Sequence, residues 1–178
     1  PPPDTVVHAG RLFDGRTGEV AEEATILVRD GRVSAVQEGF RAPPEGARLV
    51  DLRELTVLPG LIDAHTHLSS QHSQKSYAER LFMEPADYAL RAAAFARRTL
   101  EAGFTAVRDV GDRYRVSISL RDAIRKGWAR GPRIYTSGKS LATTGGHADP
   151  TNGLAEPFAF TPGPEDGVLD GPFEARKA

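Results

Sequence analysis

Two histidines separated by one residue, His65 and His67, are the side chains of this sequence best suited to hold a metal ion. They end the apolar run that begins at Leu61, and alternate residues of a strand point to the same face. Residues two apart in a strand lie roughly 6.5 Å from each other, so two imidazole nitrogens can reach one ion at about 2.0–2.1 Å. The pair therefore predicts a chelating site at the end of a strand. Two hydrogen-bonded core histidines are the alternative interpretation.

The absence of cysteine narrows the other ligands that such a site could use. These 178 residues contain no cysteine, so they offer no disulfide, thiolate nucleophile or cysteine zinc site. Any further ligand must be His, Asp, Glu or a modified Lys. Imidazole and carboxylate ligands accept Zn, Mn, Fe or Co, so the ligand types alone do not fix the metal.

A third histidine, His147, follows Gly145 and Gly146 in a loop-like stretch, 138–171, that is rich in Gly, Pro and Thr. Glycines allow a backbone to approach a substrate closely. An imidazole there could donate a hydrogen bond to a carbonyl oxygen that gains charge during hydrolysis, and a hydrogen bond that anchors the loop is the competing interpretation. We expect His72 to be a solvated loop residue and His8 to be structural.

Three charged residues near the histidine pair have two interpretations each. Asp63 shares a strand face with His65, so it either orients an imidazole or caps neighbouring backbone. Arg108 and Asp109 end the next apolar run, where they either contact substrate or form an internal ion pair.

The composition excludes partners that are bound through bulk charge. There are 23 Lys and Arg against 24 Asp and Glu, which gives a net charge of −1, so we expect no nucleic acid and no membrane as a partner. With 39% hydrophobic and 26% charged residues, the chain has the composition of a globular protein. No apolar run approaches the roughly 18 residues of a membrane helix.

The secondary structure predicted to position these residues changes after Pro59-Gly60. Before that point, short apolar runs indicate a small β unit, with an Asp30-Gly31 hairpin turn and separate strands at 48–52 and 55–58. After it, apolar strands alternate with helices, which is typical of a parallel sheet. The predicted strands are 61–65, 104–109 and 133–137, and the predicted helices are 85–102 and 117–126, with a helix start near Pro172. The first helix is expected to bury Ala89, Ala93, Ala96 and Leu100 and to leave Arg91 in solvent.

The run Val57-Leu58-Pro59-Gly60-Leu61-Ile62-Asp63-Ala64-His65-Thr66-His67-Leu68 resembles the first-strand signature of the amidohydrolase superfamily. The segments Thr105–Gly111, Gly131–Ile134 and Thr144–Asp149 resemble the branch of Xaa-Pro dipeptidases and related amide hydrolases. The resemblance implies an α/β fold. In it, residues 1–58 form the N-terminal part of a small β-sandwich domain, and residues 59–178 form the first three strands of a (β/α)8 TIM-type barrel.

The same resemblance implies roles for individual residues. His65 and His67 match metal ligands, and His147 matches a residue that binds the substrate near its carbonyl or carboxylate group and assists catalysis. In such proteins a carboxylated lysine on strand four bridges two zinc ions, and strands five to eight supply two more histidines and an aspartate base. Those strands would lie beyond Ala178, because a barrel of this type takes about 250 residues. The rest of the same polypeptide is therefore expected to complete the barrel.

These observations predict a zinc-dependent hydrolase that cleaves a peptide or peptide-like amide, such as an Xaa-Pro dipeptide or an N-acyl amino acid, with a metal-activated water. One alternative is a mononuclear deaminase or imidazolone-type hydrolase of cyclic amides. Another is a non-catalytic barrel remnant that acts as a binding subunit. We also expect a small-molecule or dipeptide-like substrate and a homo-oligomer. The opening Pro1-Pro2-Pro3 without Met fits either a cleaved export signal or a trimmed sequence, and export to a compartment such as the periplasm is favoured over the cytoplasm.

Overall fold

The computed structural model describes residues 3–177, which divide into two compact units at the junction of Pro59 and Gly60. No helix within these residues is both long enough and apolar enough to cross a membrane.

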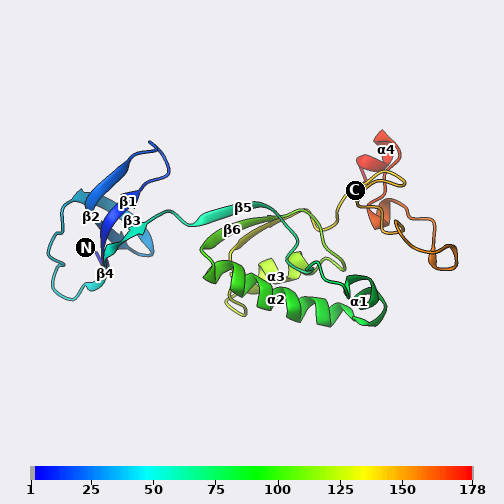
Figure 1. The fold of residues 1–178 in the computed structure, drawn as a ribbon, viewed down its shortest axis with the longest axis horizontal. Coiled ribbons are helices and arrows are strands. Elements are labelled where there is room, and N and C mark those ends of the chain that lie inside the picture. Colours follow the sequence, from blue (N-terminus) through cyan, green and yellow to red (C-terminus); the bar gives the residue numbers. More distant parts are fainter. Residues whose placement is uncertain (1–2, 178) are drawn as a thin grey trace. The chain divides into compact units, whose positions relative to one another are not determined.

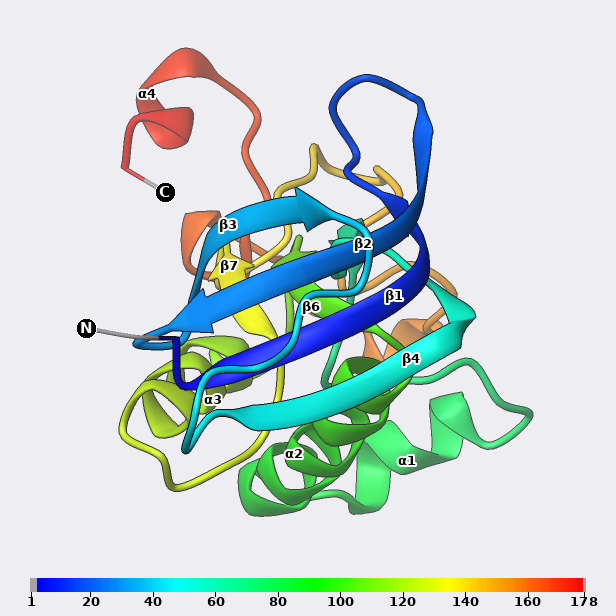
Figure 2. The ribbon, with the colours of Figure 1, turned by 90° about the vertical axis from the view of Figure 1, so that its left-hand side faces the viewer.

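The first unit is a four-stranded sheet in the order β3-β2-β1-β4 (Figure 2). Its strands are β1 (Thr5–Phe13), β2 (Val20–Arg29), β3 (Arg32–Glu38) and β4 (Arg48–Val57). β2 is antiparallel to β1 and β3, whereas β4 is parallel to β1. The predicted hairpin turn is confirmed, since Asp30 and Gly31 have φ values of 49° and 69°.

One prediction for this unit was wrong, because β4 is a single strand where two short strands were expected. A β-bulge makes this continuity possible: the pairing of β4 with β1 shifts register between Ala9 and Arg11. Gly10 lies at the shift, where an added Cβ would collide with the carbonyl of Arg53. The close approach of the two backbones therefore requires glycine at this position.

The second unit is a parallel sheet in the order β5-β6-β7, with helices α2 (Pro85–Glu101) and α3 (Val116–Arg125) along one side (Figure 1). Its strands are β5 (Leu61–Thr66), β6 (Phe104–Asp109) and β7 (Arg133–Thr136). The expected strands and helices are thus confirmed to within one residue at each end. The core between the sheet and the helices contains Leu68, Tyr88, Ala92, Ala96, Val107, Val116, Leu120 and Ile134.

The prediction for the buried face of α2 is confirmed at Ala96 but wrong at Ala89, Ala93 and Leu100, which are only partly buried. Tyr88, Ala92 and Ala96 are buried, while Ala89 and Ala93 pack only partly against the core. Alanines occur on several sides of this helix, including three in a row at 92–94, so their spacing did not identify the inner face. Tyr88 brings a large aromatic side chain into the inner face, whereas Leu90 is exposed and Phe95 and Leu100 are only partly buried.

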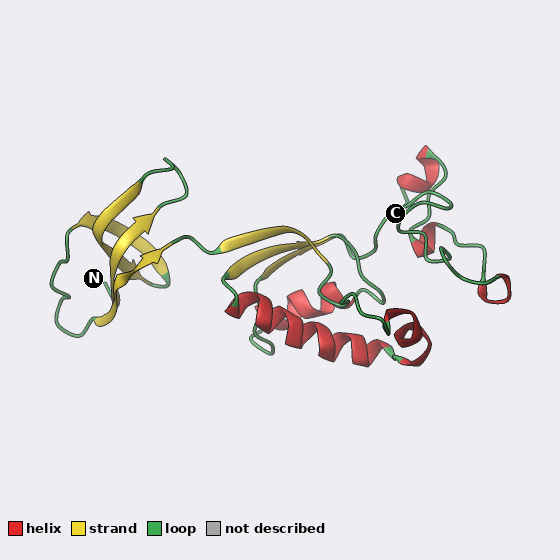
Figure 3. Cartoon of the chain, in the orientation of Figure 1, coloured by secondary structure: helices red, strands yellow, loops and turns green. Residues whose placement is uncertain are grey.

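Several short elements were not predicted or were predicted only in outline. Helix α1 (Ser76–Phe82) was not predicted, and it buries no residue. The long segment after β7 is mostly loop, as expected (Figure 3), with short turns η1 (Glu156–Phe158) and η2 (Pro164–Asp166). Helix α4 (Pro172–Ala175) begins with Pro172 at its first position, as predicted.

The two sheets make residues 3–177 an α/β chain, while the closed barrel and the closed sandwich stay predictions. The sheet face opposite the helices carries Ile62 and Tyr135, which are 71% and 60% exposed. Successive side chains of a strand point to opposite faces, and the residues next to Ile62 and Tyr135 lie in one row with the buried Val107 and Ile134. Ile62 and Tyr135 therefore point away from the helical layer. In a closed barrel this face would point to the interior.

Candidate metal centre

The structure brings His65 and His67 together at the carboxyl end of β5. Their ring centroids lie 5.5 Å apart, with an angle of 73° between the ring planes. Both side chains are exposed rather than packed into the core. Two imidazoles at this separation can direct one nitrogen each toward a shared ion, since a Zn–N bond is about 2.0–2.1 Å long.

The hydrogen bond made by His67 decides which of its nitrogens is free. Nδ1 of His67 lies 2.7 Å from the carbonyl oxygen of Gly111, which can only accept a hydrogen bond. Nδ1 must therefore carry the proton and donate it, which leaves the lone pair of Nε2 available for a metal.

The charged residues near the pair contact backbone rather than each other. Oδ1 of Asp63 accepts a hydrogen bond from the backbone nitrogen of His65 at 3.0 Å, so this carboxylate caps backbone. Nε of Arg108 donates to the carbonyl oxygen of Ala64 at 2.9 Å, and Asp109 accepts bonds from backbone nitrogens. The interpretation of Arg108 and Asp109 as an internal ion pair was therefore wrong, because each group already has a backbone partner.

Asp109 is fully buried, and two opposing effects act on the pKa of its carboxyl group. Burial raises the pKa of Asp109 above its ordinary value, because the charged form loses hydration. The backbone N–H groups of Leu68 and Gly111 donate to the carboxylate and act in the opposite direction.

His147 lies on a separate loop, after β7, and is exposed. Within residues 3–177 its ring has no hydrogen-bond partner, so it does not anchor the loop. The backbone around it is held instead by Asp149, which accepts bonds from the nitrogens of Gly145 and Thr151 and from the Thr151 hydroxyl. These three donors, the hydroxyl foremost, lower the pKa of Asp149.

One residue that supports the site was missed in the sequence. Arg91 was expected in solvent, but its Nε and Nη2 donate to the carbonyl oxygen of Ser69 at 3.2 and 2.9 Å. Its Nη1 donates to Glu79 at 2.6 Å. Arg91 thus joins α2 to α1 and to the segment that follows the histidine pair. A charged residue on a helix gives no local signal of such distant partners.

The other two histidines, His8 and His72, lie away from the pair in the sequence and have different surroundings. Nε2 of His8 lies 2.8 Å from the carbonyl oxygen of Arg41, and the ring is buried, as expected of a structural residue. His72 is exposed in the loop before α1.

The residues present fit part of a metal site. Two neutral imidazoles are suitable donors, whereas a catalytic zinc commonly has three protein ligands and an open position. Within residues 3–177 no third His, Cys, Asp or Glu joins the pair closely enough to complete a site. His65 and His67 can therefore supply two of the ligands.

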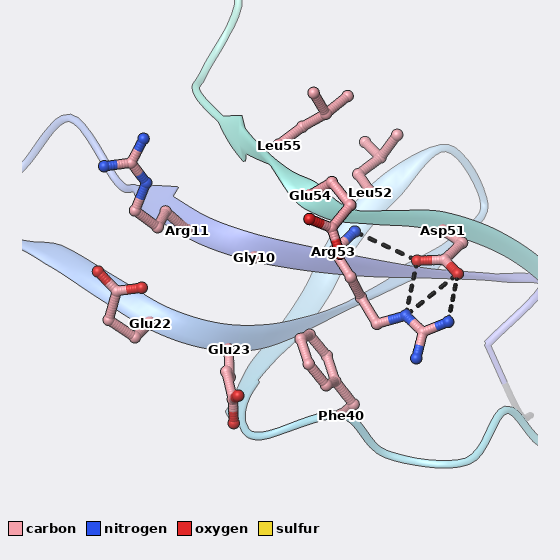
Figure 4. A pocket seen from close by; sticks show the side chains of 10 residues that line it. All are labelled: Gly10, Arg11, Glu22, Glu23, Phe40, Asp51, Leu52, Arg53, Glu54 and Leu55. Carbon is pink, nitrogen blue, oxygen red and sulfur yellow. Dashed lines mark hydrogen bonds and ion pairs between the residues drawn. The ribbon is translucent and has the colours of Figure 1, made fainter.

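The first unit has a hollow that contains none of the predicted site residues (Figure 4). It is lined by charged side chains from β1, β2 and β4 together with Gly10, Phe40, Leu52 and Leu55. Within it, Nη2 of Arg53 lies 2.6 Å from a carboxylate oxygen of Asp51. The side chain of Arg53 is the main cause that lowers the pKa of Asp51 to about 2.

Known proteins resemble this chain over most of its length. A solved structure described as an Xaa-Pro dipeptidase with methionine bound in its active site is 43% identical, with a TM-score of 0.89, over 97% of this chain and 42% of that chain. Ochratoxinase of Aspergillus niger is 29% identical over 82% of this chain and 30% of its own length. A dihydroorotase of Anaeromyxobacter sp. (strain K) is 35% identical over 57% of this chain and 20% of its own length.

The chain thus spans less than half the length of these relatives. Residues 56–178 match the Amidohydrolase family, and this match contains the histidine pair, the three parallel strands and the loop of His147. The chain belongs to the amidohydrolase family.

Proposed function

We propose that this chain is part of a metal-dependent hydrolase that cleaves a peptide or peptide-like amide bond, with an Xaa-Pro dipeptide or an N-acyl amino acid as substrate. The observation that carries the proposal is the placement of His65 and His67, with adjacent rings at the end of the first strand of the family match. Similarity to the Xaa-Pro dipeptidase structure supports the substrate class.

Each residue has a defined part in the proposed reaction. His65 and His67 would hold the metal through one nitrogen each, while the carbonyl oxygen of Gly111 accepts the hydrogen bond from the other ring nitrogen of His67. A metal held there would lower the pKa of a bound water to about 7 and so supply the nucleophile. His147 binds the substrate and donates a hydrogen bond to its carbonyl oxygen as negative charge develops there. Gly145 and Gly146 leave room for substrate beside that backbone.

The test uses the full-length protein, because the rest of the polypeptide is expected to supply the remaining ligands. It combines metal analysis with assays of Xaa-Pro dipeptides and N-acyl amino acids, with and without a chelator. His65→Ala and His67→Ala are expected to lose both metal and activity. His147→Ala is expected to keep its metal and to lose about 10²–10³-fold in kcat, the usual cost of removing one such donor. His72→Ala is the matched control and should resemble wild type.

The same measurements separate the alternatives. Membership of the amidohydrolase family does not by itself select a substrate, because the similar proteins include an ochratoxinase, a dihydroorotase and an Xaa-Pro dipeptidase. Two metal ions per chain support the proposed amide hydrolase, whereas one ion and activity only on cyclic amides or amino groups of rings support the mononuclear alternative. A protein with no metal and no activity supports the binding-subunit alternative.

A further inference from the structure

Asp109 is a buried carboxylate at the carboxyl end of β6, the central strand of the parallel sheet, and it is 0% exposed. Its Oδ2 accepts a hydrogen bond from the backbone nitrogen of Leu68 at 2.8 Å, and its Oδ1 accepts one from Gly111 at 3.1 Å. Burying a carboxylate is costly unless hydrogen bonds replace its water. Both oxygens are therefore committed to backbone donors.

The two donors belong to different loops. One loop carries His67, and the other provides the hydrogen-bond acceptor of its ring. Leu68 follows His67 directly in the chain, so its nitrogen fixes the backbone that carries the ring. Gly111 presents its carbonyl oxygen to Nδ1 of His67 at 2.7 Å. One carboxylate thus holds the backbone of His67 and the acceptor of its ring.

Gly111 is also confined from its other side. Its φ of 137° favours glycine, and an added Cβ would collide with the hydroxyl and backbone nitrogen of Ser140. The hydroxyl of Ser140 in turn donates to the carbonyl oxygen of Val110 at 3.1 Å. The carbonyl oxygen of Gly111, which accepts the hydrogen bond from His67, therefore has little freedom to move if the ring changes position.

We propose that Asp109 is a positioning residue for His67, which keeps its ring oriented and its Nε2 free for a metal. This inference rests on the proposed function, because it requires that His67 is a metal ligand. Hydrogen-bond partners of metal-binding histidines typically contribute about 10–100-fold to metal affinity or activity. Asp109 would make this contribution through Gly111 and Leu68, without touching the metal or the substrate.

The experiment measures zinc affinity of the full-length protein by competition with a chelating indicator, for wild type, Asp109→Asn and Asp112→Asn. The asparagine keeps the shape of Asp109 but presents an amide nitrogen to one of the two N–H donors, so one bond is lost. Asp112→Asn is the matched control. Asp112 also accepts two backbone N–H bonds, from Val116 and Ser117 at 2.7 Å each, but these donors belong to α3.

We expect Asp109→Asn to raise the zinc Kd at least about tenfold and to change the visible absorption spectrum of the cobalt-substituted protein. Asp112→Asn should change the zinc Kd less than twofold. A zinc Kd for folded Asp109→Asn within twofold of wild type overturns the inference. If wild type itself binds no zinc, the proposed function fails instead.

A second measurement needs no variant and covers the case in which Asp109→Asn does not fold. Coupling between two sites is reciprocal, so zinc binding should stabilise the bonds that Asp109 makes. In wild type, zinc is expected to slow hydrogen exchange at the amides of Leu68 and Gly111 more than at those of Val116 and Ser117. Equal effects on both pairs of amides overturn the inference.

Discussion

The carboxylate of Asp170 accepts two hydrogen bonds from Thr144, one from the backbone nitrogen at 2.9 Å and one from the side-chain hydroxyl. Thr144 lies just before Gly145-Gly146-His147, whereas Asp170 lies just before α4. A parallel bridge between Ala142 and Val168 joins the same two segments. The chain after η2 therefore braces the loop that carries His147.

This brace leads to a prediction for Asp170→Ala. Without the carboxylate, both bonds from Thr144 are lost, and the His147 loop should become more mobile. We expect faster hydrogen exchange in the peptide that contains residues 144–149 and, in the full-length enzyme, a higher KM. Glu165→Ala is the control, because it removes a nearby exposed carboxylate that does not contact Thr144. Unchanged exchange in residues 144–149 of Asp170→Ala would show that the brace is unimportant.

A second prediction concerns the start of α3. The residue directly before this helix, Arg115, makes no side-chain cap, and the free N–H groups of Val116 and Ser117 are bound by Asp112 instead. Loss of a capping carboxylate costs about 0.5–2 kcal/mol, so Asp112→Ala should lower the free energy of unfolding by about 1 kcal/mol in urea denaturation. Asp122→Ala, in the same helix, removes only a surface pair with Arg121 and should change it by less than about 0.5 kcal/mol. Equal losses in the two variants would contradict this capping role.

Most of the fold could be predicted from the sequence because its signals are local. β6 was predicted over the residues that form it, and α2 begins at Pro85 as its capping pattern indicated. The Asp30-Gly31 turn likewise depends only on the φ values that two adjacent residues tolerate. Helix α1 was missed because it is only seven residues long, so its apolar residues Tyr77, Leu81 and Phe82 cover barely two turns, too few to establish a helical period.

The candidate site was predictable only in part, for the same reason. The adjacency of His65 and His67 follows from the period of a strand, but their supporting contacts join residues far apart in the chain. His67 and Gly111 are separated by 44 positions, and Arg91 and Ser69 by 22. Only the folded backbone shows that a glycine carbonyl orients a histidine, or that a helical arginine binds the loop after β5.

A third prediction concerns Gly60, which directly precedes β5. Its backbone lies so close to Thr105 on β6 that an added Cβ would collide with the threonine side chain. Overpacking of this kind costs about 1–3 kcal/mol, so Gly60→Ala should lower the free energy of unfolding by that amount. Thr105→Ala in the same chain removes the colliding atoms beyond Cβ and should restore part of the loss. Gly171→Ala is the control, since Gly171 has extended backbone with φ of −167° and open space around it.

The same urea measurements decide whether the contact of Gly60 with Thr105 is tight. If Gly60→Ala is no less stable than Gly171→Ala, the two strands can separate slightly at this point without cost. A double variant no more stable than Gly60→Ala would place the strain elsewhere than on the Thr105 side chain.

A fourth prediction concerns pH and the ion pair in the hollow of Figure 4. Arg53 holds the pKa of Asp51 at about 2, below its ordinary value of 3.8. A carboxyl whose pKa is lower in the folded state stabilises the protein above its unfolded pKa, and this stabilisation is lost as the pH falls from 3.8 toward about 2. Wild type should therefore exceed Arg53→Gln in urea midpoint by a constant amount from about pH 7 to 5, and this difference should shrink below about pH 4. The difference should be small, because both side chains are exposed.

Arg11→Gln removes a positive charge from the same hollow without breaking the pair, so its difference from wild type should not follow this pH course. If the advantage of wild type over Arg53→Gln instead grows as the pH is lowered, the bond from Arg53 is not what stabilises the charged form of Asp51.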